Sequence, residues 1–134
     1  MIGPELQPIG TVESSLADPA AAPLQGDEGG PDAWLAIDER CAEALTGLEP
    51  GAEVLVLTWL HQADRETLSV HPRSDPANPV RGVFATRSQD RPNPIGLHRV
   101  HVLAIDGTRV QVSDLEAIDG TPIVDIKAVL GSER

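Results

Sequence analysis

The sequence has a single cysteine and very few aromatic residues. Its 134 residues include one Phe, two Trp and no Tyr, so a core must consist mainly of Val, Leu, Ile and Ala. Cys41 has no partner for an internal disulfide, and no cysteine cluster is available to a metal. The chain lacks an apolar run near the roughly 18 residues of a membrane span, and its N-terminus lacks a signal-peptide pattern. These absences predict one cytoplasmic domain spanning residues 1–134.

Basic side chains are also scarce, and they are concentrated in one part of the chain. The net charge is −11 at pH 7, and Lys127 is the only lysine. Residues 1–60 hold eleven acidic residues and one arginine, whereas residues 61–101 hold six arginines, four acidic residues and all four histidines. Because nucleic-acid binding depends largely on cationic side chains that neutralise phosphates, this balance argues against a general nucleic-acid binder. The segment 61–101 could still bind a small anionic ligand or one short piece of RNA.

The apolar pattern predicts a mainly β fold. Seven or eight short strands are expected, over residues 5–14, 32–37, 53–60, 67–70, 82–86, 97–105, 110–112 and 123–129. The apolar runs 53–60 and 82–86 are expected to be covered on both faces, and Asp-Gly pairs at 106–107 and 119–120 predict tight turns. One helix is expected over 38–48, with Asp38 as N-cap. This arrangement favours a single-sheet, closed or partly closed β-barrel.

The most distinctive stretch is 82–97, in which a small apolar segment is followed by a stiff polar loop. Arg87 and Arg91 precede Pro92-Asn93-Pro94, and Gly96 permits close backbone approach or a positive φ where the next strand begins. The prolines fix φ and hold the residues before them in extended conformations. A loop of this stiffness suits a site that presents polar groups to a ligand. Composition alone favours the alternative, a rigid corner between strands whose arginines are solvated.

Two motifs carry a resemblance to a known family. Gly-Val-Phe-Ala-Thr-Arg-Ser-Gln-Asp-Arg-Pro-Asn-Pro-Ile-Gly-Leu at 82–97 and Leu-Glu-Ala-Ile-Asp-Gly-Thr-Pro-Ile-Val-Asp-Ile-Lys at 115–127 resemble the TsaA-like family of TrmO-type tRNA methyltransferases. The resemblance covers essentially the whole chain and implies a homodimeric β-barrel that uses S-adenosylmethionine to methylate the exocyclic amine of threonylcarbamoyl-adenosine in tRNA. Consistently, there is no Gly-x-Gly-x-x-Gly turn of the kind that a Rossmann-type site needs. The family's motif ends in Lys-Pro-Tyr, whereas Lys127 is followed here by Ala-Val.

The resemblance also implies roles for individual residues. The residues that match the family's cofactor contacts are Pro23, Leu24, Gln25, His61, Gln62, Arg87, Leu97, Ser113, Asp114, Leu115 and Glu116. Leu24 replaces an arginine of the family, and residues 113–116 contribute mainly backbone groups. The residues expected near the substrate are Arg91, Asn93, Asp119, Thr121 and Lys127.

The chemistry expected of these residues is alignment of an in-line methyl transfer. Leu97, Leu115 and Phe84 could hold adenine by apolar contact, and Arg87 could pair with the cofactor carboxylate or with a substrate anion. His61 and Asp125 are the candidates for a catalytic base, although Asp125 and Lys127 could instead form salt bridges with neighbours. No metal site is expected, because the closely spaced His98 and His101 face opposite sides of a strand.

Three functions remain open from the sequence. The first is methylation of tRNA, with any RNA contact confined to the face that carries Arg65 to Arg99 and doubled in a dimer. The second is S-adenosylmethionine-dependent methylation of a small molecule, which the acidic charge favours. The third is a barrel that binds the cofactor without turnover.

Overall fold

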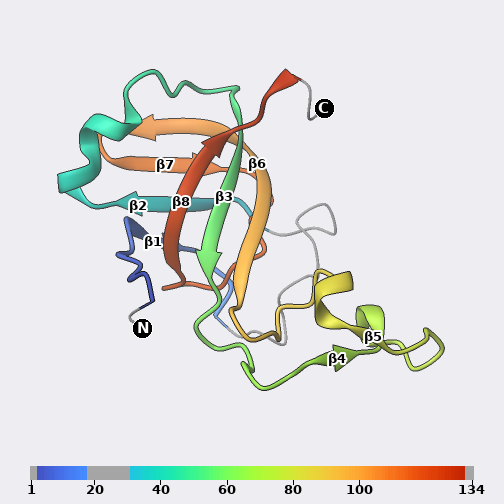
Figure 1. The fold of residues 1–134 in the computed structure, drawn as a ribbon. Helices are drawn as coiled ribbons and strands as arrows, with labels where there is room; N and C mark the ends of the chain where they lie inside the picture. Colours follow the sequence, from blue (N-terminus) through green and yellow to red (C-terminus); the bar gives the residue numbers. More distant parts are fainter. Residues whose placement is uncertain (1–2, 18–30, 132–134) are drawn as a thin grey trace.

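In the computed structural model, which describes residues 3–17 and 31–131, six antiparallel strands close into a barrel (Figure 1). The order around the ring is β1-β2-β7-β6-β3-β8, and β8 pairs with β1 to complete it. The strands are β1 Gly10–Glu13, β2 Ala33–Ile37, β3 Glu53–Trp59, β6 Ile95–Asp106, β7 Arg109–Val112 and β8 Pro122–Ala128. The predicted mainly β, single-sheet barrel is therefore confirmed.

Two short strands lie outside the barrel. β4 (Ser69–Val70) and β5 (Arg81–Gly82) pair with each other and form a hairpin beside the barrel, between the end of β3 and the start of β6 (Figure 1). With them the described residues contain eight strands, within the predicted number. No helix in the described part of the chain is long and apolar enough to cross a membrane.

The barrel interior is filled by side chains that alternate along each strand. On β6, Val100 and Val102 are buried while Leu103 is exposed, as the sequence pattern predicted. The core cluster contains only Val, Leu, Ile and Ala, namely Val12, Ala33, Leu35, Ile37, Val54, Val56, Val100, Val102, Val110, Val112, Leu115, Ala117 and Ile123. The composition therefore predicted the chemistry of the core correctly.

The expectation that residues 53–60 are covered on both faces is wrong. Along β3, buried Val54, Val56 and Thr58 alternate with residues of intermediate exposure such as Leu55 and Leu57. A closed barrel has one interior, so each wall strand buries one face and leaves the other accessible. The outward apolar residues of β3 consequently remain partly available to a ligand or a partner.

The predicted helix over 38–48 is a shorter 3₁₀ helix, η3 (Glu39–Leu45). Asp38 precedes it, but its side chain makes no capping hydrogen bond. Gly47, with φ +90°, reverses the chain soon afterwards, which leaves too little length for a regular α-helix. Cys41 and Leu45 pack against the core as the apolar stripe predicted.

The strand predicted over 82–86 is also wrong. β5 ends at Gly82, and residues Val83–Ala85 form a 3₁₀ turn, η5, in which Phe84 is 85% exposed. The Arg91 side chain donates hydrogen bonds to the carbonyls of Val83 and Thr86, so these carbonyls bond a side chain instead of a neighbouring strand. Another 3₁₀ turn, η4 (Pro72–Ser74), lies between β4 and β5.

Candidate functional site

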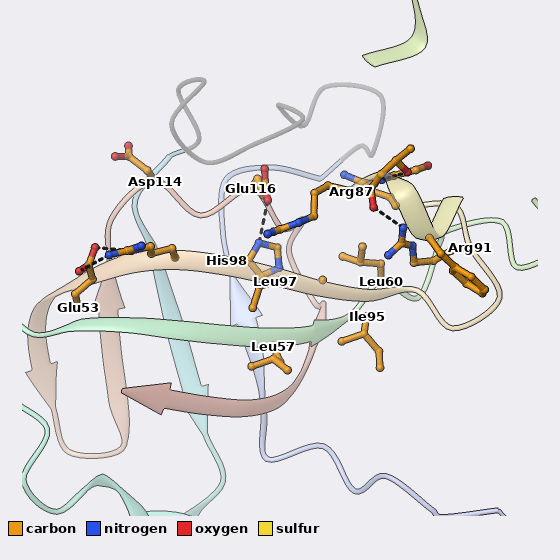
Figure 2. A pocket seen from close by; sticks show the side chains of 16 residues that line it. Glu53, Leu57, Leu60, Arg87, Arg91, Ile95, Leu97, His98, Asp114 and Glu116 are labelled. Atoms are coloured by element: carbon orange, nitrogen blue, oxygen red, sulfur yellow. Dashed lines mark hydrogen bonds and ion pairs between the residues drawn. The ribbon is translucent and has the colours of Figure 1, made fainter. Parts of the chain in front are cut away.

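A cavity of about 900 Å³ lies beside the first half of β6 (Figure 2). β7 pairs with β6 only from Val102 onward. The preceding residues of β6, 95–101, pair with β3 on one edge and have no partner among the described strands on the other. Apolar side chains of Leu57, Ile95 and Leu97 line the cavity together with polar groups from the loop 86–91 and from residues 114–116. A mixed lining of this size suits a nucleoside-like ligand that also carries charge.

The polar loop that borders the cavity is fixed by hydrogen bonds. Arg91 Nη2 donates to Thr86 O at 2.8 Å, and Arg91 N donates to Asp64 O at 3.0 Å. Arg65 Nε donates to Pro92 O at 2.7 Å, and its Nη2 donates to Asn93 Oδ1 at 3.1 Å. Arg91 and Asn93, which were predicted near the substrate, therefore hold the shape of the loop, and their contact with substrate stays a prediction.

Arg87 differs from Arg91 because its guanidinium is not used to hold the loop. Its residue is exposed, it lines the cavity, and it makes no hydrogen bond or ion pair with any described residue. A guanidinium in this position has its donors available for a carboxylate or phosphate. The predicted anion-binding role of Arg87 fits this geometry.

Buried Thr58 and His98 form a polar cluster with the mostly buried Glu116, and His98 and Glu116 line the same cavity (Figure 2). Thr58 Oγ1 is 2.7 Å from His98 Nε2, and His98 Nδ1 is 3.3 Å from Glu116 Oε1. The second contact has the distance of an ion pair without the alignment of a hydrogen bond, and Glu116 Oε2 is buried with no partner among the described residues. Glu116 therefore lines the cavity with one carboxylate oxygen that is buried and unsatisfied among the described residues.

Register between β3 and β6 brings this cluster together. Thr58 lies directly opposite Gly96, and Val56 lies opposite His98, so Thr58 and His98 are diagonal neighbours on the inner face. A Cβ at Gly96 would collide with Thr58 Oγ1 and His98 Nε2, which confirms the expected close approach at this glycine. Sequence reasoning missed Thr58 and His98 as site residues. The available signal was that His98 shares the inward parity of Val100 and Val102.

A second cavity of about 270 Å³ adjoins the first. It is lined by the predicted cofactor contacts His61 and Gln62, and it shares Leu60, Gln89 and Glu116 with the larger cavity. The structure thus brings His61 and Gln62 near Arg87, Leu97, Asp114 and Glu116, although they are far apart in sequence.

The remaining predicted residues have other surroundings. Leu115 is fully buried in the core and lines neither cavity, whereas Phe84 and Leu97 do face the larger one. Ser113 Oγ accepts a hydrogen bond from His101 N at 3.0 Å, and Asp119 Oδ1 accepts one from Ser14 N at 3.0 Å. Pro23, Leu24 and Gln25 lie outside the described residues.

The second motif is divided between two places. Thr121 lines the smaller cavity, and its hydroxyl donates to Ile118 O at 2.7 Å. Asp125 borders a separate cavity of about 360 Å³ beside Cys41, and its Oδ2 is 3.3 Å from Lys127 Nζ. The two candidate bases, His61 and Asp125, are therefore not brought into one cavity.

Residues 11–132 match the model of the tRNA-methyltransferase O N-terminal domain family. The chain belongs to this family. It is 40% identical over 122 residues to an S-adenosyl-L-methionine-binding protein of Archaeoglobus fulgidus, which covers 91% of this chain and 86% of that protein. It is 44% identical over 97 residues to a probable S-adenosyl-L-methionine-binding protein of Methanocaldococcus jannaschii, covering 69% of this chain and 77% of that protein.

Solved structures of the family show the same fold. The crystal structure of TrmO from Pseudomonas aeruginosa superposes with a TM-score of 0.77 at 30% sequence identity and covers 98% of this chain. The chain spans 57% of the length of that structure's chain. Family membership and barrel architecture are therefore established on independent grounds.

Proposed function

We propose that this protein is an S-adenosylmethionine-dependent methyltransferase that N-methylates threonylcarbamoyl-adenosine in tRNA and works as a homodimer. The observation that carries the cofactor assignment is the cavity beside β6, which combines the Arg87 guanidinium, unpaired among the described residues, with the apolar side chains of Leu57, Ile95 and Leu97. Relatives named as S-adenosyl-L-methionine-binding proteins support it. When bound, this cofactor supplies an activated methyl group.

The residues of the cavity divide the work of binding between apolar and charged groups. Leu57, Ile95 and Leu97 line the cavity and would contact the adenosine part, and Arg87 would pair with the carboxylate of the amino-acid part. The loop held by Arg91 keeps Arg87 at one rim of the cavity, so little entropy is lost when the ligand binds. The protein accelerates the reaction chiefly by aligning the methyl group with its acceptor.

Transfer RNA as the acceptor is supported by the family and by the arginines of the β4–β5 hairpin. Arg73 and Arg81 are exposed there, and the chain continues from β5 directly into η5, whose Phe84 lines the cavity. The competing acceptor is a small molecule, which the net charge of −11 and the single lysine favour. A barrel that binds the cofactor without turnover is the remaining alternative.

A homodimer is supported by apolar side chains on the outer face of β6. Ile95, Leu97 and Leu103 are each more than two-fifths exposed, at 41%, 41% and 42%. Arg99 and His101 lie between Leu97 and Leu103 on the same face, and exposed apolar side chains are a common feature of subunit interfaces. Light scattering during size-exclusion chromatography tests this part of the proposal directly.

Calorimetry followed by methyl transfer separates the alternatives. Binding of S-adenosylmethionine is expected, and labelled methyl groups should then pass from the cofactor to bulk tRNA at low salt, where electrostatic attraction is greatest. Binding without labelling of tRNA would contradict the tRNA assignment and favour a small acceptor or a non-catalytic barrel. Loss of all binding would refute the proposal as a whole.

A further inference from the structure

Glu116 differs from the other carboxylates around the two adjoining cavities. Its side chain is only 13% exposed, and Oε2 has no hydrogen-bond partner among the described residues. Glu53 accepts two hydrogen bonds from Arg99, at 2.8 and 3.1 Å, and Asp90 accepts one from Asp64 N at 2.8 Å. Asp114 is exposed to solvent. A mostly buried carboxylate with an unsatisfied oxygen calls for a cationic or hydrogen-bonding ligand group.

Nδ1 of the His98 ring faces Glu116 Oε1. An Nδ1 lone pair 3.3 Å from a carboxylate oxygen would be repelled by it, so the contact is attractive only if Nδ1 is protonated. In neutral histidine, Nε2 then accepts the hydroxyl hydrogen of Thr58, which lies 2.7 Å away. Thr58 and His98 therefore position the Glu116 carboxylate through a contact that does not occupy Oε2.

Glu116 also lies where the reacting atoms must meet. Only Leu60, Gln89 and Glu116 line both described cavities, and Glu116 alone of these three carries charge. If the cofactor and the methyl acceptor occupy neighbouring cavities, the in-line path of the methyl group passes their junction. In that arrangement the cofactor sulfur would lie closer to Glu116 than to the other described carboxylates that line the two cavities, Glu53, Asp90 and Asp114.

We propose that Glu116, positioned by His98 and Thr58, is the counter-ion of the cationic sulfur and makes the site prefer the charged methyl donor over its neutral demethylated product. This assignment rests on the proposed function. When the methyl group leaves, the electron pair of the S–CH₃ bond stays on sulfur, so the positive charge that attracts Glu116 disappears. The same carboxylate that holds the methyl donor thus stops holding the product, which favours its release.

The test is a comparison of affinities for S-adenosylmethionine and S-adenosylhomocysteine by calorimetry. Glu116→Gln keeps the size of the side chain and removes its charge, so binding of S-adenosylmethionine should weaken about tenfold or more, the range of charged contacts of a partly buried group. Binding of S-adenosylhomocysteine should change by less than about threefold, within the range of neutral substitutions at such a site. Glu49→Gln, which removes one exposed charge outside both cavities, is the control for net charge.

Variants of Thr58 test the positioning step. Thr58→Val removes the hydroxyl that orients His98 but keeps the side-chain shape. The affinity for S-adenosylmethionine relative to that for S-adenosylhomocysteine should therefore fall partway toward the value for Glu116→Gln. Thr58→Ser, which keeps the hydroxyl, should restore the ratio. A purely structural role of Thr58 would not change this ratio, and urea unfolding of each variant confirms that it is folded.

Three outcomes would overturn the assignment, and they differ from one another. Equal weakening of both ligands by Glu116→Gln would place the carboxylate against a group that donor and product share, such as the α-ammonium. Unchanged affinity for S-adenosylmethionine would remove Glu116 from the binding site. If the unmodified protein bound neither ligand, the proposed function would fail, and the assignment with it.

Discussion

Gly96 should be the least replaceable glycine of the motif, because its missing side chain makes room for the Thr58–His98 contact. A Cβ at this position would collide with Thr58 Oγ1, would lie 2.7 Å from His98 Nε2 and would lie 3.2 Å from His98 Cε1. Both side chains are almost fully buried, so neither can swing into solvent to relieve the overlap. Gly96→Ala must therefore displace the cluster itself.

The expected cost of Gly96→Ala follows from two effects. Forcing a methyl group into a packed interior costs about 1–3 kcal/mol. Breaking the buried Thr58–His98 hydrogen bond adds about 1–3 kcal/mol, because both polar groups stay buried without another hydrogen-bond partner. Alanine in a strand recovers about 0.5–1 kcal/mol relative to glycine, so we expect a net loss of about 1–5.5 kcal/mol in the free energy of unfolding.

Urea unfolding measures this loss, and Gly82→Ala is the matched control. The nearest atom to a Cβ at Gly82 is Leu68 O at 3.9 Å, an ordinary contact, so this variant should unfold within about 1 kcal/mol of the unmodified protein. Adding Thr58→Ala to Gly96→Ala should recover part of the loss, with a coupling of about 1 kcal/mol between the two sites. If Gly96→Ala and Gly82→Ala unfold at the same urea concentration, the buried contact does not require glycine and the reasoning is refuted.

The remaining predictions concern the arginines and the outer face of β6. Arg87→Met should leave the unfolding free energy unchanged, since its guanidinium has no partner among the described residues, but should weaken S-adenosylmethionine binding about tenfold in calorimetry. Arg91→Met should instead lower the free energy of unfolding in urea by about 1–3 kcal/mol, because the carbonyls of Val83 and Thr86 lose their donor. Equal stability of the two variants would contradict this division of roles. Leu103→Glu places charge on the outer face of β6, so light scattering should show a shift from dimer toward monomer, and an unchanged mass would exclude that face as the interface.

The barrel could be predicted because its signals are local. Alternation along β6 and the turn at Asp106-Gly107, where Gly107 has φ +63°, indicate strands and a hairpin without knowledge of the rest of the chain. The segment 82–86 could not be assigned in the same way, since five small apolar residues fit a strand and a turn equally well. What decided its structure was the Arg91 side chain, which supplies the hydrogen bonds that a neighbouring strand would otherwise make.

The site was predicted less completely than the fold, because it depends on register between distant strands. Arg87, His61 and Glu116 were found through the family motifs, and the structure places all three at the adjoining cavities. Thr58 and His98 lie outside both family motifs. Their contact exists only because β3 and β6 pair with Thr58 opposite Gly96. A shift of that register by one residue would turn Thr58 outward and separate the pair.

Asp125 shows how one irregularity in a strand changes which carboxylate reaches the site. Strict alternation from buried Ile123 would turn both Asp125 and Lys127 toward the barrel interior. The pairing of β8 with β3 instead shifts between Leu57 and Thr58, so Ile123 lies opposite Thr58 while Asp125 lies opposite Leu57. The extra residue moves Asp125 and Lys127 to the outer face, where they form an ion pair with each other. Glu116, which precedes β8 and is not affected by the bulge, is therefore the carboxylate of this motif that faces both cavities.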